Sequence, residues 1–151
     1  MADQTESSIV INASPADIMA VIADLPAYPQ WSDGINEVVV LSVFEDDDRP
    51  ADARFNLSSG AIKDIYELEY DWDEDRKVSW TLTKGDMLTA MDGAYALTPN
   101  GDGTTTVNYR LAVDVKIPMI GMIKRKAEKV IVDTALKGLK KRVESLSSPA
   151  G

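Results

Sequence analysis

Acid–base chemistry in this chain could be carried by aspartate, glutamate, tyrosine or lysine, because its 151 residues include neither histidine nor cysteine. This composition excludes Ser-His-Asp and Cys-His nucleophilic catalysis, histidine- and cysteine-ligated metals, and disulfides. Asp64 and Tyr66 are the candidates for proton transfer, since residues two apart point to the same face of a strand. We assign no catalytic residue from the sequence, and we expect neither a metal nor a cofactor.

Alternating patterns predict the strands that position these residues. Tyr66, Leu68, Tyr70 and Trp72 alternate with acidic residues, which predicts a strand with one apolar face and one face in water. The same alternation recurs at 78–83 and 107–115, and β-type segments occur at 7–11, 38–44, 53–57 and 91–97. We therefore predict an antiparallel sheet of about seven strands with one solvated face.

Helical patterns flank this series of strands. Ser14 followed by Pro15 is a good helix start, which predicts a short helix over 16–23 and a further helical turn over 25–31. After Pro118 the apolar residues step by three and four, which predicts a helix to about Ser145, roughly 40 Å long at 1.5 Å per residue. The predicted fold is α+β, with a curved sheet wrapped around a long C-terminal helix and two short helices after the first strand.

Four segments carry a resemblance to a known group of proteins. The stretches 11–18 and 24–31, the turn 101–105 leading into Val107–Tyr109, and the final helix resemble the SRPBCC superfamily. This superfamily includes START lipid-transfer domains, the birch-pollen-allergen fold, polyketide cyclase/dehydrases and coenzyme Q-binding proteins. The resemblance implies a single helix-grip domain over about residues 6–146. The small and polar residues 147–151 that follow the final helix predict a disordered tail. The resemblance also implies a hydrophobic cavity between the sheet and the long helix, which holds lipids, isoprenoid quinones, polyketides or other apolar ligands.

The candidate ligand-binding residues follow from strand phase and from the beginning of the last helix. From the short helical turn and the sheet they are Trp31, Phe55, Asp64, Tyr66, Leu68, Trp80, Leu82, Tyr95, Tyr109 and Leu111. From the segment that enters the helix they are Met119, Ile120, Met122, Ile123, Ala127 and Val130. Each of these side chains would equally suit an ordinary apolar core, so both interpretations stay open.

Asp64 departs from its surroundings, because its strand phase projects a carboxylate onto the apolar face. An unpaired charge there is costly. We expect the residue to lie at the strand's start, where the face is still in water. The alternative is a protonated acid or an arginine-paired carboxylate inside the cavity.

The connection over 117–123 is unusually apolar for a loop between a strand and a helix. It can simply pack as the start of the helix. Alternatively it is a gate to the cavity, in which adaptable methionine side chains meet the ligand and the basic residues 124–126 meet a lipid headgroup.

The formal charge of −9 disfavours nucleic acid as a partner, since phosphate binding requires a basic surface. The charge is uneven: residues 116–142 carry a net +7 and the remainder −16. This basic segment is a solvated helix face, or else it binds an anionic partner or a membrane surface in transient contact. No run reaches the about 18 apolar residues of a membrane span, and the polar residues 1–8 are unlike a secretory signal, so we expect a cytoplasmic protein.

These observations predict a protein that binds a small hydrophobic or amphipathic ligand, such as a lipid, an isoprenoid quinone or a polyketide. The first alternative is a polyketide cyclase/dehydrase-type enzyme that uses tyrosine or aspartate in the cavity. The second is a protein-interaction module that uses Lys137, Lys140 and Lys141 of the basic helix. The sequence does not decide the oligomeric state.

Overall fold

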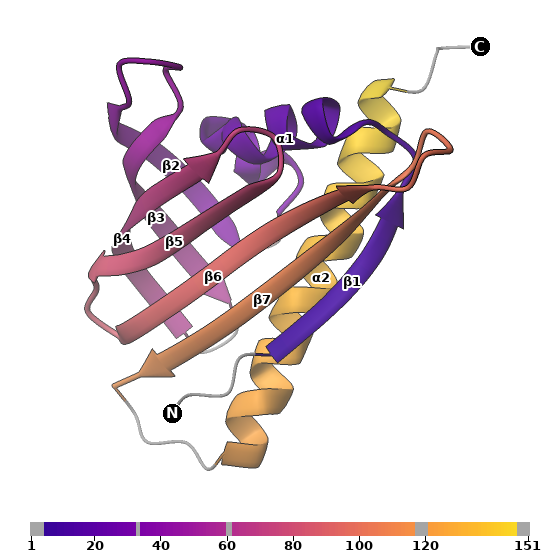
Figure 1. Ribbon diagram of the computed structural model, residues 1–151. Coiled ribbons are helices and arrows are strands. Elements are labelled where there is room, and N and C mark those ends of the chain that lie inside the picture. Colours follow the sequence, from indigo (N-terminus) through magenta and orange to yellow (C-terminus); the bar gives the residue numbers. More distant parts are fainter. Residues whose placement is uncertain (1–4, 33, 60–61, 117–120, 148–151) are drawn as a thin grey trace.

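The alternating segments form a single antiparallel sheet in the computed structural model, which describes residues 5–32, 34–59, 62–116 and 121–147. Within these residues the sheet has seven strands in the order β1-β7-β6-β5-β4-β3-β2 (Figure 1). The strands are β1 (Thr5–Ile11), β2 (Ile35–Val43), β3 (Pro50–Ser59), β4 (Ile62–Asp73), β5 (Lys77–Lys84), β6 (Leu88–Pro99) and β7 (Thr105–Val115). The predicted fold class is confirmed.

The helices also lie where the sequence predicts them. α1 (Pro15–Ala23) begins at Ser14, whose Oγ accepts a hydrogen bond of 3.2 Å from the backbone N–H of Asp17. The 3₁₀ helix η1 (Leu25–Gln30) follows, and α2 (Gly121–Ser147) is the long C-terminal helix. None of the helices that the structure describes is long and apolar enough to cross a bilayer. Of the predicted tail over 147–151, Ser147 is the last residue of α2, and 148–151 lie outside the described residues.

The long helix packs against one side of the sheet. α2 runs alongside β1 and β7, whereas β2, β3 and β4 curve away at the opposite side (Figure 1). Its buried face carries Val132, Leu136, Leu139 and Val143, and this face shares the core with α1. The ammonium of Lys140 also donates a 2.9 Å hydrogen bond to the carbonyl of Val10 in β1. This packing fixes α2 along one edge and separates it from the far strands.

Candidate functional site

A cavity of about 470 Å³ lies between the curved sheet and α2. This volume is in the range of small-molecule binding sites. Aromatic side chains make up much of its wall: Tyr28, Trp31, Phe55, Tyr66, Tyr70, Trp80, Tyr95 and Tyr109. The remaining lining includes aliphatic residues of β3, β6, β7 and α2, so the cavity presents a largely apolar surface.

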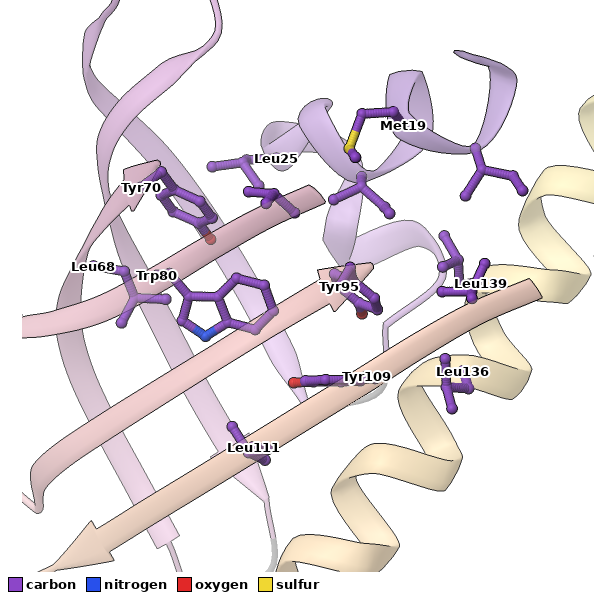
Figure 2. Close-up of a cluster of buried hydrophobic side chains, with 14 of the residues drawn as sticks. Met19, Leu25, Leu68, Tyr70, Trp80, Tyr95, Tyr109, Leu111, Leu136 and Leu139 are labelled. Atoms are coloured by element: carbon purple, nitrogen blue, oxygen red, sulfur yellow. The ribbon is translucent and has the colours of Figure 1, made fainter. Parts of the chain in front are cut away.

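Ring packing along the sheet supports the cavity wall. Phe55 and Tyr66 are paired across β3 and β4, and their rings stack with centroids 5.3 Å apart. Tyr95 and Tyr109 are paired across β6 and β7, with centroids 4.5 Å apart. Figure 2 shows Trp80, Tyr95 and Tyr109 on three neighbouring strands, on the side of the sheet that faces α2. These rings pack against their neighbours along the inner face of the sheet, and the cavity lies between them and α2.

The tyrosine hydroxyls are the first set of polar groups in the cavity. The hydroxyl of Tyr28 donates a hydrogen bond of 2.5 Å to the carbonyl of Ile22. Among the residues that the structure describes, none bonds to the hydroxyls of Tyr66, Tyr70, Tyr95 and Tyr109. Burial raises the pKa of each of these four phenols well above its ordinary value. They therefore stay protonated and can donate hydrogen bonds to a ligand.

Trp31 supplies another donor at the edge of the cavity. Its indole Nε1 is buried and has no hydrogen-bond partner within the described part of the chain. The ring packs edge-on against Tyr28 with centroids 4.9 Å apart, and the Trp31 carbonyl lies close to Gly138 of α2. Trp31 also borders a second, outer cleft formed by α1 and the end of α2. The residue thus lies between the inner cavity and this outer cleft.

Glu128 of α2 is a polar lining residue that the sequence interpretation missed. Its side chain is buried, with only 2% of the residue exposed. Oε1 accepts a 2.8 Å hydrogen bond from the hydroxyl of Thr5, and Oε2 accepts a 2.7 Å bond from the backbone N–H of Val113. In the described residues, the pairing of β1 with β7 starts at Thr5 and Leu111. Glu128 therefore links the two strands at this end of their pairing, because Thr5 belongs to β1 and Val113 follows Leu111 by two residues in β7.

The structure brings most of the sequence-predicted side chains together around the cavity. Those that line it are Trp31, Phe55, Tyr66, Leu68, Trp80, Tyr95, Tyr109, Leu111, Ala127 and Val130. Leu82 is not among the described lining residues and packs at the margin of the core. Met119 and Ile120 lie outside the described residues, as do the side chains of Met122 and Ile123 and with them the proposed gate. The sequence interpretation overlooked the other described lining residues, which are Tyr28, Ser32, Gly34, Ile35, Leu57, Ser58, Tyr70, Leu88, Met91, Val113, Val115, Glu128, Ile131, Thr134 and Ala135.

The expectation that Asp64 faces water is wrong. The residue is buried, with 6% exposed, and it is not among the described lining residues of the cavity. Its carboxylate accepts hydrogen bonds from three consecutive backbone N–H groups where the β5–β6 loop enters β6, those of Asp86 (3.2 Å), Met87 (3.1 Å) and Leu88 (2.8 Å). The partners are therefore neutral loop amides rather than water or arginine, which assigns Asp64 a role in holding the loop.

One of the three lysines considered on the basic face of α2 makes contacts within the fold. Lys140 binds the Val10 carbonyl and lies 2.6 Å from a carboxylate oxygen of Glu144. Lys137 and Lys141 are exposed. Two of the three lysines considered for a partner surface are therefore free to meet solvent.

Comparisons with known proteins agree on the fold. The sequence profile of a family described as polyketide cyclase/dehydrase and lipid transport matches residues 2–144. A START superfamily protein from Mycobacterium smegmatis is 25% identical to the chain, with a TM-score of 0.88 over 95% of this chain and 99% of that one. No curated protein matches the chain.

Two further solved structures show the same fold at lower identity. A protein from Thermus thermophilus is 22% identical, with a TM-score of 0.79 over 97% of this chain and 100% of that one. The Zhui aromatase/cyclase from a Streptomyces species is 12% identical, with a TM-score of 0.81 over 100% and 99% of the two chains. The fold is accordingly the START-type helix-grip fold.

Proposed function

The chain belongs to the polyketide cyclase/dehydrase and lipid transport family, and from this premise we propose that it binds one small hydrophobic or amphipathic molecule in the cavity between the sheet and α2. Lipids, isoprenoid quinones and polyketide-like compounds are the ligand classes that such a cavity suits. The protein then acts as a carrier or a receptor for this molecule, and turnover is not required.

The observation that carries the proposal is a set of unpartnered polar groups in an otherwise apolar wall. Polar groups inside proteins are normally hydrogen-bonded, and leaving them without partners is costly. Within the described residues, the Trp31 indole N–H is the one fully buried side-chain polar atom without a partner. The hydroxyls of four phenols that line the cavity have no protein partner either, and they keep some contact with the open space of the cavity. A ligand with an apolar skeleton and oxygen acceptors fills the space and supplies the missing partners. An ordinary core would instead have been filled by side chains.

An entrance for such a ligand lies along α2. Val130 and Ile131 line the cavity, yet they are 59% and 44% exposed. Thr134, one turn further along, is also exposed and lines the same space. Side chains that meet both solvent and the cavity mark its rim. Apolar residues at that rim suit the passage of a hydrophobic molecule.

The second candidate function is a cyclase or dehydrase that acts on a polyketide-like substrate. Tyr66 is the residue that favours it, because a protonated phenol in an apolar cavity can bind a carbonyl oxygen and stabilise the charge that develops on it. Asp64, the other candidate, is engaged by the β5–β6 loop. This function requires turnover that is lost in Tyr66→Phe, whereas a carrier would keep its stoichiometric binding.

Mass spectrometry tests the proposal without any assumption about the identity of the ligand. The protein purified from cells is measured under native conditions and again after denaturation in organic solvent. We expect a native mass that exceeds the chain mass by one small molecule, and the release of that molecule on denaturation. A protein that is empty and also fails to bind a neutral apolar dye would refute the proposal.

A further inference from the structure

The charge of the cavity wall is the feature that narrows the ligand class further. Glu128 is the one carboxylic acid among the described lining residues, and no lysine or arginine is among them. The tyrosines are protonated because burial raises their pKa values. The wall that the structure describes therefore contains one acidic side chain and no basic one.

The carboxylate of Glu128 retains capacity for another hydrogen-bond donor. Two ionised carboxylate oxygens offer about four acceptor positions. One is used by the Thr5 hydroxyl and one by the Val113 N–H. Both donors are neutral, so they leave the charge of the carboxylate uncompensated. Because Glu128 lines the cavity while 2% exposed, this charge acts on the cavity interior more strongly than on bulk water.

An anionic ligand group would meet this charge unfavourably. Like charges repel more strongly in a low-dielectric interior than in water, and the phenols donate hydrogen bonds without adding positive charge. A hydroxyl or ammonium group, by contrast, donates to the free acceptor positions of Glu128.

We propose that Glu128 sets the charge selectivity of the cavity, which accepts neutral or cationic amphiphiles bearing a hydroxyl or amine and rejects those bearing a carboxylate or phosphate. This inference rests on the proposed function, because it requires that the cavity binds a ligand at all. It goes beyond the proposed function by excluding fatty acids and phospholipid headgroups from the inner cavity.

Three probes with the same apolar skeleton test the selectivity. Naphthylmethanol, naphthylmethylamine and naphthoate, all substituted at the same ring position, compete near neutral pH against the uncharged dye N-phenylnaphthylamine bound to the wild-type protein. We expect the alcohol and the amine to displace the dye at concentrations at least about tenfold lower than naphthoate does. This comparison needs no variant, so it does not depend on the folding of a mutant.

The substitution Glu128→Gln then assigns the selectivity to one side chain. We expect naphthoate to gain affinity and the amine to lose it, each by about tenfold relative to the alcohol. Asp133→Asn removes the same charge from the same helix at a residue outside the described lining, and it should leave the order of the probes unchanged. Circular dichroism establishes that both variants are folded.

The outcomes separate the two proposals. Naphthoate that binds wild-type protein as tightly as the alcohol, or an order of probes unaltered by Glu128→Gln in a folded protein, would overturn the assignment to Glu128 while the cavity remains a ligand site. If the dye and all three probes fail to bind, the proposed function is refuted and the selectivity with it.

Discussion

The indole ring of Trp80 in β5 lies across Gly93, its direct partner on β6. A Cβ atom built on Gly93 would approach Cε2 and Cζ2 of Trp80 to 2.4 Å, a distance that no side chain could tolerate without displacement of the ring. The glycine therefore lets a large ring lie flat over the neighbouring backbone. Trp80 in turn packs against Tyr95 and Tyr109, with centroids 5.4 and 5.7 Å apart. The position of these rings in the cavity wall therefore depends on the absence of a side chain at residue 93.

Gly93→Ala should destabilise the protein by about 2 kcal/mol, because overpacking of the ring outweighs the about 0.5–1 kcal/mol that alanine ordinarily gains over glycine through chain entropy. Urea unfolding measures this change. In a Trp80→Leu background the same substitution should be close to neutral, since the ring is gone. Equal destabilisation in both backgrounds would show that the close contact is not the cause.

Asp64→Asn should lower the free energy of unfolding by about 3 kcal/mol, because an amide cannot accept from all three loop N–H groups and its own NH₂ would face a donor. Urea unfolding and faster hydrogen exchange at Met87 and Leu88 report the loss. The matched control is Asp86→Asn, which removes an exposed carboxylate from the same loop. An Asp64→Asn protein with unchanged stability and unchanged exchange at Met87 and Leu88 would contradict the role of Asp64 in holding the loop.

Alkaline pH should unfold the protein and ionise its tyrosines together. Burial raises the pKa of all five tyrosines above the ordinary value of 10.0. Above that value the unfolded chain loses phenolic protons that the folded chain keeps, so stability is intact below it and falls as pH rises. The loss is up to about 1.4 kcal/mol per pH unit for each tyrosine.

Absorbance at the tyrosinate band, recorded against pH alongside circular dichroism, follows both events. We expect tyrosinate to form only as the fold is lost, and in guanidinium to form near the ordinary pKa of free tyrosine. Stepwise ionisation while the circular dichroism spectrum stays native would contradict the burial of the phenols.

The sequence was sufficient for the fold because its patterns are local. Alternation such as Tyr66-Glu67-Leu68-Glu69 shows which strand face is buried, and Ser14-Pro15 marks a helix start without any tertiary information. The inward face of the sheet could therefore be assigned in advance, and several aromatic residues of that face line the cavity.

The features that escaped prediction depend on contacts between distant segments. Glu128 lies one turn before Val132 in the buried stripe of α2, but an acidic residue interrupts the apolar pattern by which such stripes are found. Its partners lie on two strands far away in the sequence, Thr5 on β1 and Val113 on β7. The amide groups that bind Asp64 lie more than twenty residues along the chain, in a loop whose path no local pattern reveals.

Filling the cavity is the most direct test of the account. N-phenylnaphthylamine is titrated into the wild-type protein, into Ala127→Trp, which places an indole in the cavity from α2, and into Lys126→Trp, which places the same ring on the exposed neighbouring residue. We predict saturable binding of one dye per chain to the wild type and to Lys126→Trp, and at least about tenfold weaker binding to Ala127→Trp while the protein stays folded. Binding that is equal in all three proteins would contradict the account, because the dye would then lie outside the cavity.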